Sequence, residues 1–300
     1  MPPERTATTY GPGITGASKT VLLELMATLR IYQDALVLIG GWVPYFLLEQ
    51  SQRPNDQFIH VGSIDIDVAV DPLKINEPEY ATIVELLKER GYAPAADKQG
   101  SAIPSSFERT VRSPATNKPY AIRVDFLTHV DGQSSIKSRH VSVQNDLFAR
   151  KIKGCAAAFK YQTRFSLSGA LPDGGEMTVP IRMADLVGCL TMKGIVLGER
   201  YREKDAYDIY ALIAHYQHGP ADVAETLRPH LSDGLVRESV ESIQAAFAHR
   251  SANGPAWVAG FLVNPLFSAE RERFITDAFM VVDEFQRLLR RPEPAARSSG

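Results

Sequence analysis

The chain has 300 residues, 44% of them hydrophobic, and its 33 basic and 35 acidic side chains leave a net charge of −2. This length allows one large or two modest domains with a buried core, and the near-neutral charge excludes a global electrostatic attraction to nucleic acid or membranes. We find no apolar run of membrane-spanning length and no signal-peptide pattern, so we expect a cytoplasmic protein. Cys155 and Cys189 lack metal-ligand spacing and lie in apolar surroundings, which predicts buried, reduced thiols.

The first elements in chain order are a tail, a helix, a strand and a second helix. Residues 1–17 are rich in Pro, Thr and Gly and predict a flexible tail. Ser18 is a candidate N-cap for a helix over residues 19–32, whose leucines recur at helical spacing. The run ALVLIGG (35–41) predicts a short buried strand that ends in two glycines, and a helix is expected over residues 42–50.

The next elements alternate between strand and helix. Residues 63–70 (SIDIDVAV) alternate apolar and polar side chains, which predicts a strand. An amphipathic helix is expected over residues 77–92, with Gly91 as its stop signal. After a turn around residues 113–119, residues 120–130 (YAIRVDFLTHV) predict a further strand.

The second half of the chain changes character. Residues 131–180 are less regular, with hairpin-like pieces and a PDGGE turn, and the chain from Arg182 onward is helical in pattern. We therefore expect an α/β (α+β) fold, in which a mixed-sheet core domain over residues 18–180 is followed by a helical domain over residues 181–291. A cleft between the two lobes is expected, and residues 292–300 predict a disordered tail.

Three carboxylates stand out because they fall within apolar strands. Asp65 and Asp67 share one strand face with Ser63, and like charges placed roughly 7 Å apart repel one another unless a cation lies between them. Asp125, on the later strand, lies on the face opposite Ile122, Val124 and Phe126. Converging carboxylates suit Mg²⁺, which binds a few carboxylates together with phosphate oxygens and water, and two such ions could serve in-line displacement on a triphosphate.

The glycine pair Gly40-Gly41 adds a second feature at a strand-to-helix turn. Glycines there let backbone N–H groups approach a ligand, and the following helix N-terminus favours an anion such as phosphate. Each feature alone also fits a plainer structure: the glycines a tight turn, Asp-x-Asp a solvated strand face, and Asp125 an ion pair with Arg123 or Arg112. Their conjunction favours a catalytic site.

Other classes of Asp-x-Asp site fit less well. A calcium loop needs oxygen ligands at alternate positions and glycine at the sixth, where this chain has Ala69 and Val70. A phosphatase of the haloacid dehalogenase type would carry Thr or Val two residues after the second Asp, where this chain has Ala69. It would also carry a later paired acidic motif after a strand, which this chain lacks. A glycosyltransferase stays open as an alternative, but it would leave the glycine pair without a role.

The three motifs, LIGGWVPYFLL, HVGSIDIDVAV and IRVDFLT, resemble in their order the nucleotidyltransferase superfamily with the polymerase-beta-like fold. Within it the chain is most similar to the AbiEii/AbiGii toxin-like group, which adds a helical lysine and a Lys/Arg-Asp-x-x-Asp motif. Here these are Lys193 and the run Lys204-Asp205-Ala206-Tyr207-Asp208. The resemblance covers roughly residues 35 to 215. It departs at His60-Val61-Gly62-Ser63, where the group often has Arg-x-Ser/Thr.

The resemblance implies an NTP-dependent, pyrophosphate-releasing nucleotidyltransferase. It implies catalytic roles for Asp65, Asp67, Asp125, Lys193, Asp205 and Asp208, with the first three holding Mg²⁺, two ions being expected. Gly40, Gly41, Ser63, Lys193 and Lys204 are then the donor-binding residues. The alternative for the helical motif is a salt-bridge network on a helix face with Arg182, Arg200 and Arg202.

The acceptor is less well defined by the sequence. Residues 137–164 carry Lys137, Arg139, Arg150, Lys151, Lys153, Lys160 and Arg164 against the single acid Asp146. Such a segment fits an RNA backbone, and it fits ordinary surface charge about as well. The expected partners are therefore an NTP, an RNA or tRNA acceptor, and an antitoxin protein. The alternative to an enzyme is a non-enzymatic protein, a degenerate module that binds nucleotide without catalysis.

Overall fold

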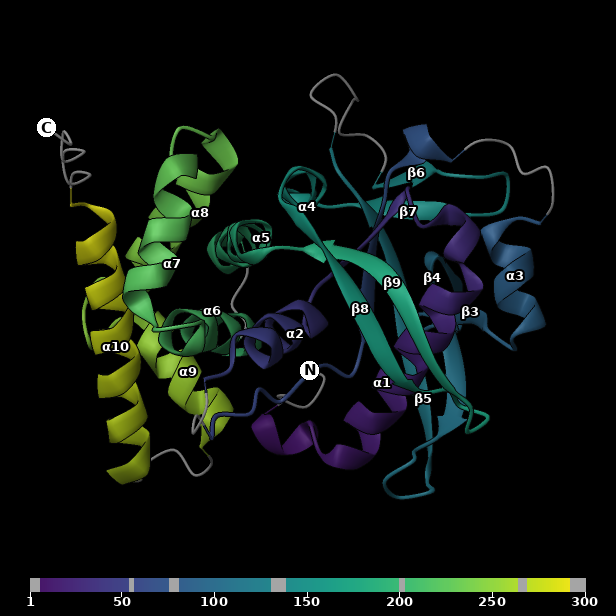
Figure 1. The fold of residues 1–300 in the computed structure, drawn as a ribbon, viewed down its shortest axis with the longest axis horizontal. Coiled ribbons are helices and arrows are strands. Elements are labelled where there is room, and N and C mark those ends of the chain that lie inside the picture. Colours follow the sequence, from purple (N-terminus) through teal and green to yellow (C-terminus); the bar gives the residue numbers. More distant parts are fainter. Residues whose placement is uncertain are drawn as a thin grey trace, which may run out of the picture.

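The structure is a computed structural model that describes residues 6–53, 57–75, 81–130, 139–199, 203–263 and 269–291. Within these residues a mixed sheet lies on one side and most of the helices gather on the other (Figure 1). The expected α/β fold with a helical C-terminal part is confirmed. The sheet has nine strands in the described residues: β1 Leu36–Ile39, β2 Ile66–Val70, β3 Ala93–Ala96, β4 Ala102–Arg112, β5 Pro119–Thr128, β6 His140–Ser142, β7 Phe148–Lys151, β8 Gln162–Ala170 and β9 Glu176–Ala184.

The strand order is β3-β4-β5-β2-β1-β9-β8, with β7 also beside β5 and β6 beside β7. The central strand β2 runs antiparallel to β1 and parallel to β5, and β4 runs antiparallel to β5. The predicted strands over residues 35–41, 63–70 and 120–130 are therefore present as β1, β2 and β5. The PDGGE turn joins β8 and β9 into an antiparallel hairpin.

The register of β5 separates an apolar face from a polar one. Ile122, Val124 and Phe126 are fully buried, and Arg109, the partner of Ile122 on β4, forms an ion pair with Glu24 at 3.2 Å. Glu24 belongs to helix α1 (Pro12–Thr28), so α1 covers the apolar face. Side chains alternate along a strand, and Asp125 consequently lies on the other face, as the sequence predicts.

The N-terminal helix begins earlier than the sequence predicts. The short 3₁₀ turn Ala7–Thr9 precedes it, and α1 starts at Pro12, with Gly11 as its N-cap. Ser18 lies inside the helix, where it is fully buried and accepts a hydrogen bond from the Trp42 indole at 3.1 Å. The prediction of a flexible tail over residues 1–17 is therefore wrong for residues 6–17, because proline fits a first helical turn and tertiary packing holds the small residues.

The next helices follow their sequence signals more closely. Helix α2 (Trp42–Ser51) begins directly after the glycine pair, as predicted. Helix α3 (Ile83–Glu89) has Thr82 and Glu85 as a capping box and ends before Gly91, whose φ of 78° provides the stop. The first residues of the predicted helix, 77–80, lie outside the described residues. The remaining short helices are the 3₁₀ turns Arg30–Tyr32 and Pro72–Lys74 and helix α4 (Cys155–Lys160).

The helical half begins directly after β9. It comprises α5 Leu186–Glu199, α6 Glu203–His215, α7 Pro220–Leu227, the 3₁₀ turn Arg228–His230, α8 Gly234–Ala246, α9 Asn253–Leu262 and α10 Ala269–Leu289 (Figure 1). The predicted boundary at residue 180 falls inside β9, and the helical pattern expected from Arg182 starts only at Leu186, because residues 182–184 pair with β8. Helices α5 and α6 contact α4 and α2, respectively, which brings the helical half against the sheet domain.

Other predictions have simpler outcomes. Cys155 and Cys189 are buried free thiols, as expected. The predicted disordered tail over residues 292–300 lies outside the described residues. Across the described ranges, no helix has both the length and the apolar character that a membrane crossing requires.

Helix packing in this half requires a glycine at residue 194 of α5. A Cβ added to Gly194 would lie 2.1 Å from the Ser239 hydroxyl and 2.7 Å from the Ser239 carbonyl of α8. We expect Gly194→Ala to lower the free energy of unfolding by roughly 1–3 kcal/mol through overpacking. Gly260→Ala, where the nearest atom to the added Cβ is 3.9 Å away, should instead raise it by up to about 1 kcal/mol. Urea unfolding of both variants checks this, and equal shifts would contradict it.

Candidate active site

The sheet register brings two of the predicted carboxylates side by side. Asp67 on β2 is directly opposite Asp125 on β5, and Asp125 is opposite Ser106 on β4. Register partners project to the same face of a sheet, so Ser106, Asp125 and Asp67 form a row across three strands. On the other side of this row, Asp67 pairs with Ile39, the last residue of β1.

The glycine pair follows Ile39 and closes around Asp67. Gly40 has a φ of 76°, and a Cβ there would lie 2.2 Å from an Asp67 carboxylate oxygen. A Cβ on Gly41 would lie 2.7 Å from the Ser63 hydroxyl and 3.9 Å from the Lys204 ammonium nitrogen. The backbone of the turn therefore packs closely against a carboxylate and a hydroxyl and lies near a lysine, three groups that are far apart in the sequence.

Asp67 is under electrostatic strain in this position. Burial, followed by repulsion from Asp125 and Asp65, raises the pKa of Asp67 to about 7, although Lys193 and Arg150 act in the opposite direction. A carboxyl with a pKa raised in this way lacks compensating positive charge. The sequence predicts such a repulsion, because it places Asp65 and Asp67 close together without a cation between them.

Asp125 has partners of its own on the polar face. Its Oδ1 atom accepts hydrogen bonds from the Ser106 hydroxyl and from Arg123 Nε at 3.0 Å, and Arg123 also donates to Ser106 at 3.1 Å. The ion pair with Arg123 is one of the two that the sequence offers as the plainer explanation of Asp125. Both donors reach Oδ1, and no residue in the described ranges donates to Oδ2.

Asp65 and Ser63 lie just before β2 rather than on it. The strand begins at Ile66, and the Ser63 hydroxyl donates to the Asp65 backbone carbonyl at 2.8 Å. The predicted strand over residues 63–70 is therefore shorter than expected, because this segment bends. Ser63 is nevertheless buried and lies against Gly41.

A second, buried cluster of charges comes from α5 and α6. Asp208 is fully buried, and its carboxylate is ion-paired with Lys193 at 2.6 Å and with Lys204. Lys193 also contacts Asp205 at 2.8 Å. Burial alone would raise the pKa of Asp208, but the two ammonium groups outweigh it and hold this pKa well below its usual range. The carboxylate is therefore ionised at any neutral pH.

His60 completes this cluster. Its Nδ1 atom accepts a hydrogen bond from the Gly62 N–H at 3.1 Å, so the proton is on Nε2, which donates to Asp208 at 2.9 Å. Burial, and then the charge of Lys204, lowers the pKa of His60 to about 4. The sequence shows a departure from the family pattern at this position, and the structure shows a neutral imidazole bound to the helical motif.

Lys204 connects the two clusters. Its ammonium group lies 5.3 Å from the ring centres of Tyr10 and Tyr207 and next to the Gly41 turn. Burial lowers the pKa of Lys204, and Asp208 offsets this only in part. Lys204 is thus a partly buried cation near the N-terminus of α2, which is the end of a helix that favours anions.

The ion-pair alternative for the helical motif is partly correct. Asp205 and Asp208 do form ion pairs, but their partners are lysines of the motif itself and the network is buried. Arg182 instead pairs with Asp34, and Arg200 and Arg202 lie outside the described residues.

The expected magnesium site can be tested against this geometry. In the described part of the chain, no group of three or more His, Cys, Asp or Glu side chains is arranged to hold a metal ion. A ready-made cage of Asp65, Asp67 and Asp125 is therefore not formed, because Asp125 is held toward Ser106 and Arg123. Mg²⁺ commonly uses one or two carboxylates plus phosphate oxygens and water. The raised pKa of Asp67 fits such an arrangement, since a cation would relieve the repulsion.

Sequence reasoning missed the roles of three residues. Ser106 and His60 reach the site through sheet register and chain folding, for which no local pattern is a signal. Arg150 lies on β7 opposite Leu127 of β5, and the sequence identified it only as part of a basic segment. Two lysines of that segment are engaged elsewhere, Lys153 with Glu238 and Lys160 with Asp233.

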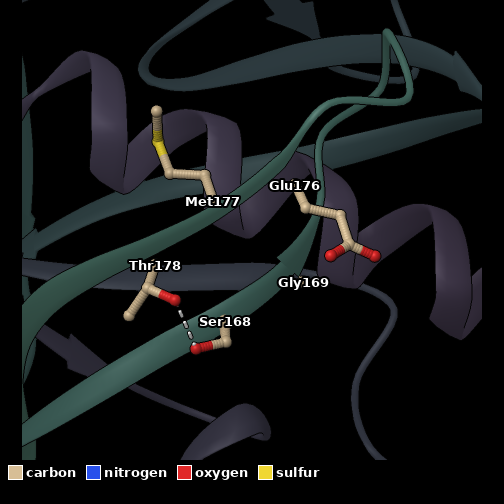
Figure 2. Close-up of a pocket in the computed structure, with 5 residues that line it drawn as sticks. All are labelled: Ser168, Gly169, Glu176, Met177 and Thr178. Atoms are coloured by element: carbon tan, nitrogen blue, oxygen red, sulfur yellow. Dashed lines mark hydrogen bonds between the residues drawn. The ribbon is translucent and has the colours of Figure 1, made fainter.

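A surface pocket also lies on the β8–β9 hairpin, away from the carboxylates. Figure 2 shows its lining residues, among which the Ser168 and Thr178 hydroxyls share a hydrogen bond of 2.8 Å. Met177 is six residues along β9 from Met183, the partner of Leu38 on β1. At strand rise this is roughly 20 Å, so the pocket is separate from the candidate active site.

Comparisons with known proteins give distant likenesses. No protein-family model matches the sequence, and no match is found among characterised proteins. One likeness is to a solved structure of an antigenic nucleotidyltransferase-like protein from Paracoccidioides brasiliensis. The similarity covers 74% of this chain and 93% of that protein's chain, with 16% sequence identity and a TM-score of 0.39. MenT4, a nucleotidyltransferase toxin from Mycobacterium tuberculosis, is similar over 95% of this chain and 90% of its own, with 15% identity and the same TM-score. Both solved structures are nucleotidyltransferase-like. At these low scores, the likeness is one of fold, and the chemistry of the site resides in the side chains described above.

The pKa of Asp67 leads to a prediction about stability. A folded-state pKa near 7 lies above the ordinary carboxyl value, so the folded protein binds the extra proton and loses stability as pH rises from about 4 to about 7. We expect Asp67→Asn, measured with a chelator present, to raise the free energy of unfolding at pH 8 by up to roughly 4 kcal/mol. Near pH 4 the difference should vanish.

The matched control is Asp173→Asn in the exposed β8–β9 turn. Urea unfolding across pH 4–8 should show no pH-dependent gain for this variant. A constant offset between wild type and Asp67→Asn over the whole range would contradict the prediction.

Proposed function

We propose that the protein is a magnesium-dependent nucleotidyltransferase, which transfers a nucleoside monophosphate from an NTP to an acceptor hydroxyl and releases pyrophosphate. The observation that carries this proposal is the contact of the Gly40-Gly41 turn with Asp67, Ser63 and Lys204. A phosphate-binding turn and a carboxylate pair belong together in phosphoryl transfer, because a triphosphate must be held beside the charges that activate it.

The donor-binding side is the turn between β1 and α2. Backbone N–H groups at the start of α2, the Ser63 hydroxyl and the Lys204 ammonium group can all face a phosphate. Lys193 has a raised pKa because Asp205 and Asp208 outweigh its burial, so it stays charged. In this proposal Asp208 and His60 position Lys204. Lys193, which is ion-paired with Asp205 and Asp208, adds positive charge behind them.

The reacting side is the carboxylate row. Asp65, Asp67 and Asp125 would hold Mg²⁺, up to two ions, which would neutralise the triphosphate charge and polarise the α-phosphorus when bound. The acceptor oxygen then bonds to the α-phosphorus while the bond to the bridging oxygen breaks and pyrophosphate leaves. Asp125 Oδ2 is the proposed recipient of the hydroxyl proton, since Ser106 and Arg123 hold the other oxygen in place.

The acceptor we favour is RNA, including tRNA. A role as the toxin of a toxin–antitoxin or abortive-infection system, with an antitoxin as partner, follows from the sequence resemblance and stays a prediction. The alternatives are a binding module without catalysis and an Asp-x-Asp transferase of another class.

Loss of the carboxylates should abolish transfer. We expect Asp65→Ala and Asp67→Ala to reduce label transfer from each of four radiolabelled NTPs into total RNA to background, because either change removes a proposed magnesium ligand. Circular dichroism should show folded variants. No transfer by the wild type and no magnesium-dependent NTP binding would refute the enzyme, and wild-type activity in both variants would refute the site.

Loss of the lysine at the glycine turn should act on the donor. Lys204→Met removes a charged donor to phosphate, which is worth roughly 1.5–3 kcal/mol, so we expect KM for the NTP to rise about 10- to 100-fold. Asp208 keeps Lys193 and His60 as partners in this variant. Lys153→Met, which removes an exposed lysine paired with Glu238, is the control, and an equal effect of the two substitutions would exclude this role for Lys204.

A further inference from the structure

The position of Arg150 follows from the register of β7 against β5. Arg150 is opposite Leu127, and Leu127 is two residues from Asp125 on the same strand. Residues two apart on a strand share a face, and so do register partners. Arg150 therefore lies on the same face as the carboxylates. Strand geometry places the Cα atoms of Asp125 and Arg150 roughly 8 Å apart.

The side chain of Arg150 carries a positive charge on this face. It is half-buried, and among the described residues it has no side-chain hydrogen bond or ion pair, although its backbone pairs with β5 and β6. Its charge reaches Asp67, where it acts to lower the carboxyl pKa, and it reaches His140, its register partner on β6. The guanidinium group is thus close enough to interact electrostatically with the carboxylates, and no ion pair with them neutralises its charge.

Three other cations around the site are paired within the described residues. Lys193 and Lys204 are bound by Asp208, and Arg123 is bound by Asp125. A half-buried arginine without a partner costs desolvation that a bound anion would offset. Arg150 is accordingly a candidate contact for an anionic group that comes with a substrate.

The order of the strands decides which substrate this is. The proposed donor-binding residues surround the end of β1, and the carboxylates follow on β2 and β5. Arg150 comes next, on β7, beyond Asp125. The carboxylates therefore separate Arg150 from the glycine turn, so an anion at Arg150 would be carried by the acceptor.

We propose that Arg150 binds the acceptor of the reaction, by holding a backbone phosphate of an RNA strand next to the hydroxyl that is to be extended. This inference rests on the proposed nucleotidyl transfer and adds the residue that contacts its RNA acceptor. Arginine suits the task because its planar guanidinium makes paired hydrogen bonds to phosphate oxygens. An RNA hydroxyl at a strand end is accompanied by its own phosphodiester, whereas a serine or tyrosine acceptor on a protein brings no such anion.

Other basic residues lie near Arg150 but differ in the face they occupy. Arg139 directly precedes His140, the register partner of Arg150 on β6, whereas Lys151 follows Arg150 on β7 and therefore lies on the opposite face of the sheet. Lys153 and Lys160 of the same segment are turned to acids of α8 and its N-cap. Among the described arginine and lysine residues of β6 and β7, Arg150 is therefore the one that shares a face with the carboxylates.

The experiment compares Arg150→Ala and Arg150→Lys with Arg237→Ala, an exposed arginine of α8 that serves as the control. The full chain is used in two assays. The first follows transfer of radiolabelled NTP into total RNA while each substrate is varied in turn. The second follows the binding of a fluorescent single-stranded oligoribonucleotide without NTP over a series of salt concentrations.

We expect Arg150→Ala to raise the RNA concentration at half-maximal rate about tenfold, while the KM for NTP changes less than twofold. The slope of log affinity against log salt should fall in magnitude by about 0.7, which corresponds to one lost phosphate contact. Arg150→Lys should recover part of the affinity and all of the salt slope, because lysine keeps the positive charge but lacks the paired N–H donors of the guanidinium group. Arg237→Ala should match the wild type in both assays.

Four outcomes would overturn the inference: no RNA binding by the wild type, unchanged RNA affinity and salt slope in Arg150→Ala, a rise in the KM for NTP equal to that for RNA, or label in protein and not in RNA. The failure of the proposed function is distinguishable, because it shows as a wild type that transfers no label at all. The binding assay then still reports on Arg150.

Discussion

The buried carboxylate of Asp208 is the interaction on which the site depends. It binds Lys193 of α5, Lys204 of α6 and His60 of the segment before β2, and it is fully buried. Burying a charge is costly unless it is paired and hydrogen-bonded, and removing a partner of such a pair leaves an uncompensated charge. The cluster therefore ties the helical half to the segment that leads into β2, and it places Lys204 at the glycine turn.

The sheet contributes an opposite kind of constraint. Around Asp208 the charges compensate one another, whereas around Asp67 they do not, since Asp125 and Asp65 both raise its pKa. A slip of one residue between β2 and β5 would turn one of the two carboxylates into the apolar face and separate it from the other. A rigid, buried strand thus maintains a repulsion that a cation and a triphosphate would relieve. Such stored destabilisation is typical of functional sites.

The two clusters meet at one short turn. Gly40 leaves room for the Asp67 carboxylate, and Gly41 leaves room for Ser63 and approaches Lys204. Neither position can carry a side chain without displacing a group of the site. The turn connects the cluster around Asp208, whose charges balance one another, with the carboxylates around Asp67, whose charges do not.

Much of this could be predicted from the sequence, because it depends on local patterns. The alternation in SIDIDVAV and in YAIRVDFLT predicted the strands, the faces of Asp67 and Asp125, and a repulsion between Asp65 and Asp67. The glycine pair predicted a strand-to-helix turn. Helix boundaries were less predictable: Ser18 has the chemistry of an N-cap, yet it lies inside α1 because Trp42 packs against it.

Contacts between distant segments were decided only by the tertiary structure. Nothing in the sequence around His60 predicts Asp208 as its partner, 148 residues away, and nothing around Arg123 or Arg150 says which strand will lie beside β5. The sequence alone determined which side chains share a strand face, because that follows from the two-residue repeat of a strand. Strand order and helix docking decided which of those side chains meet, because the pairing of distant segments is set by the packing of the whole core.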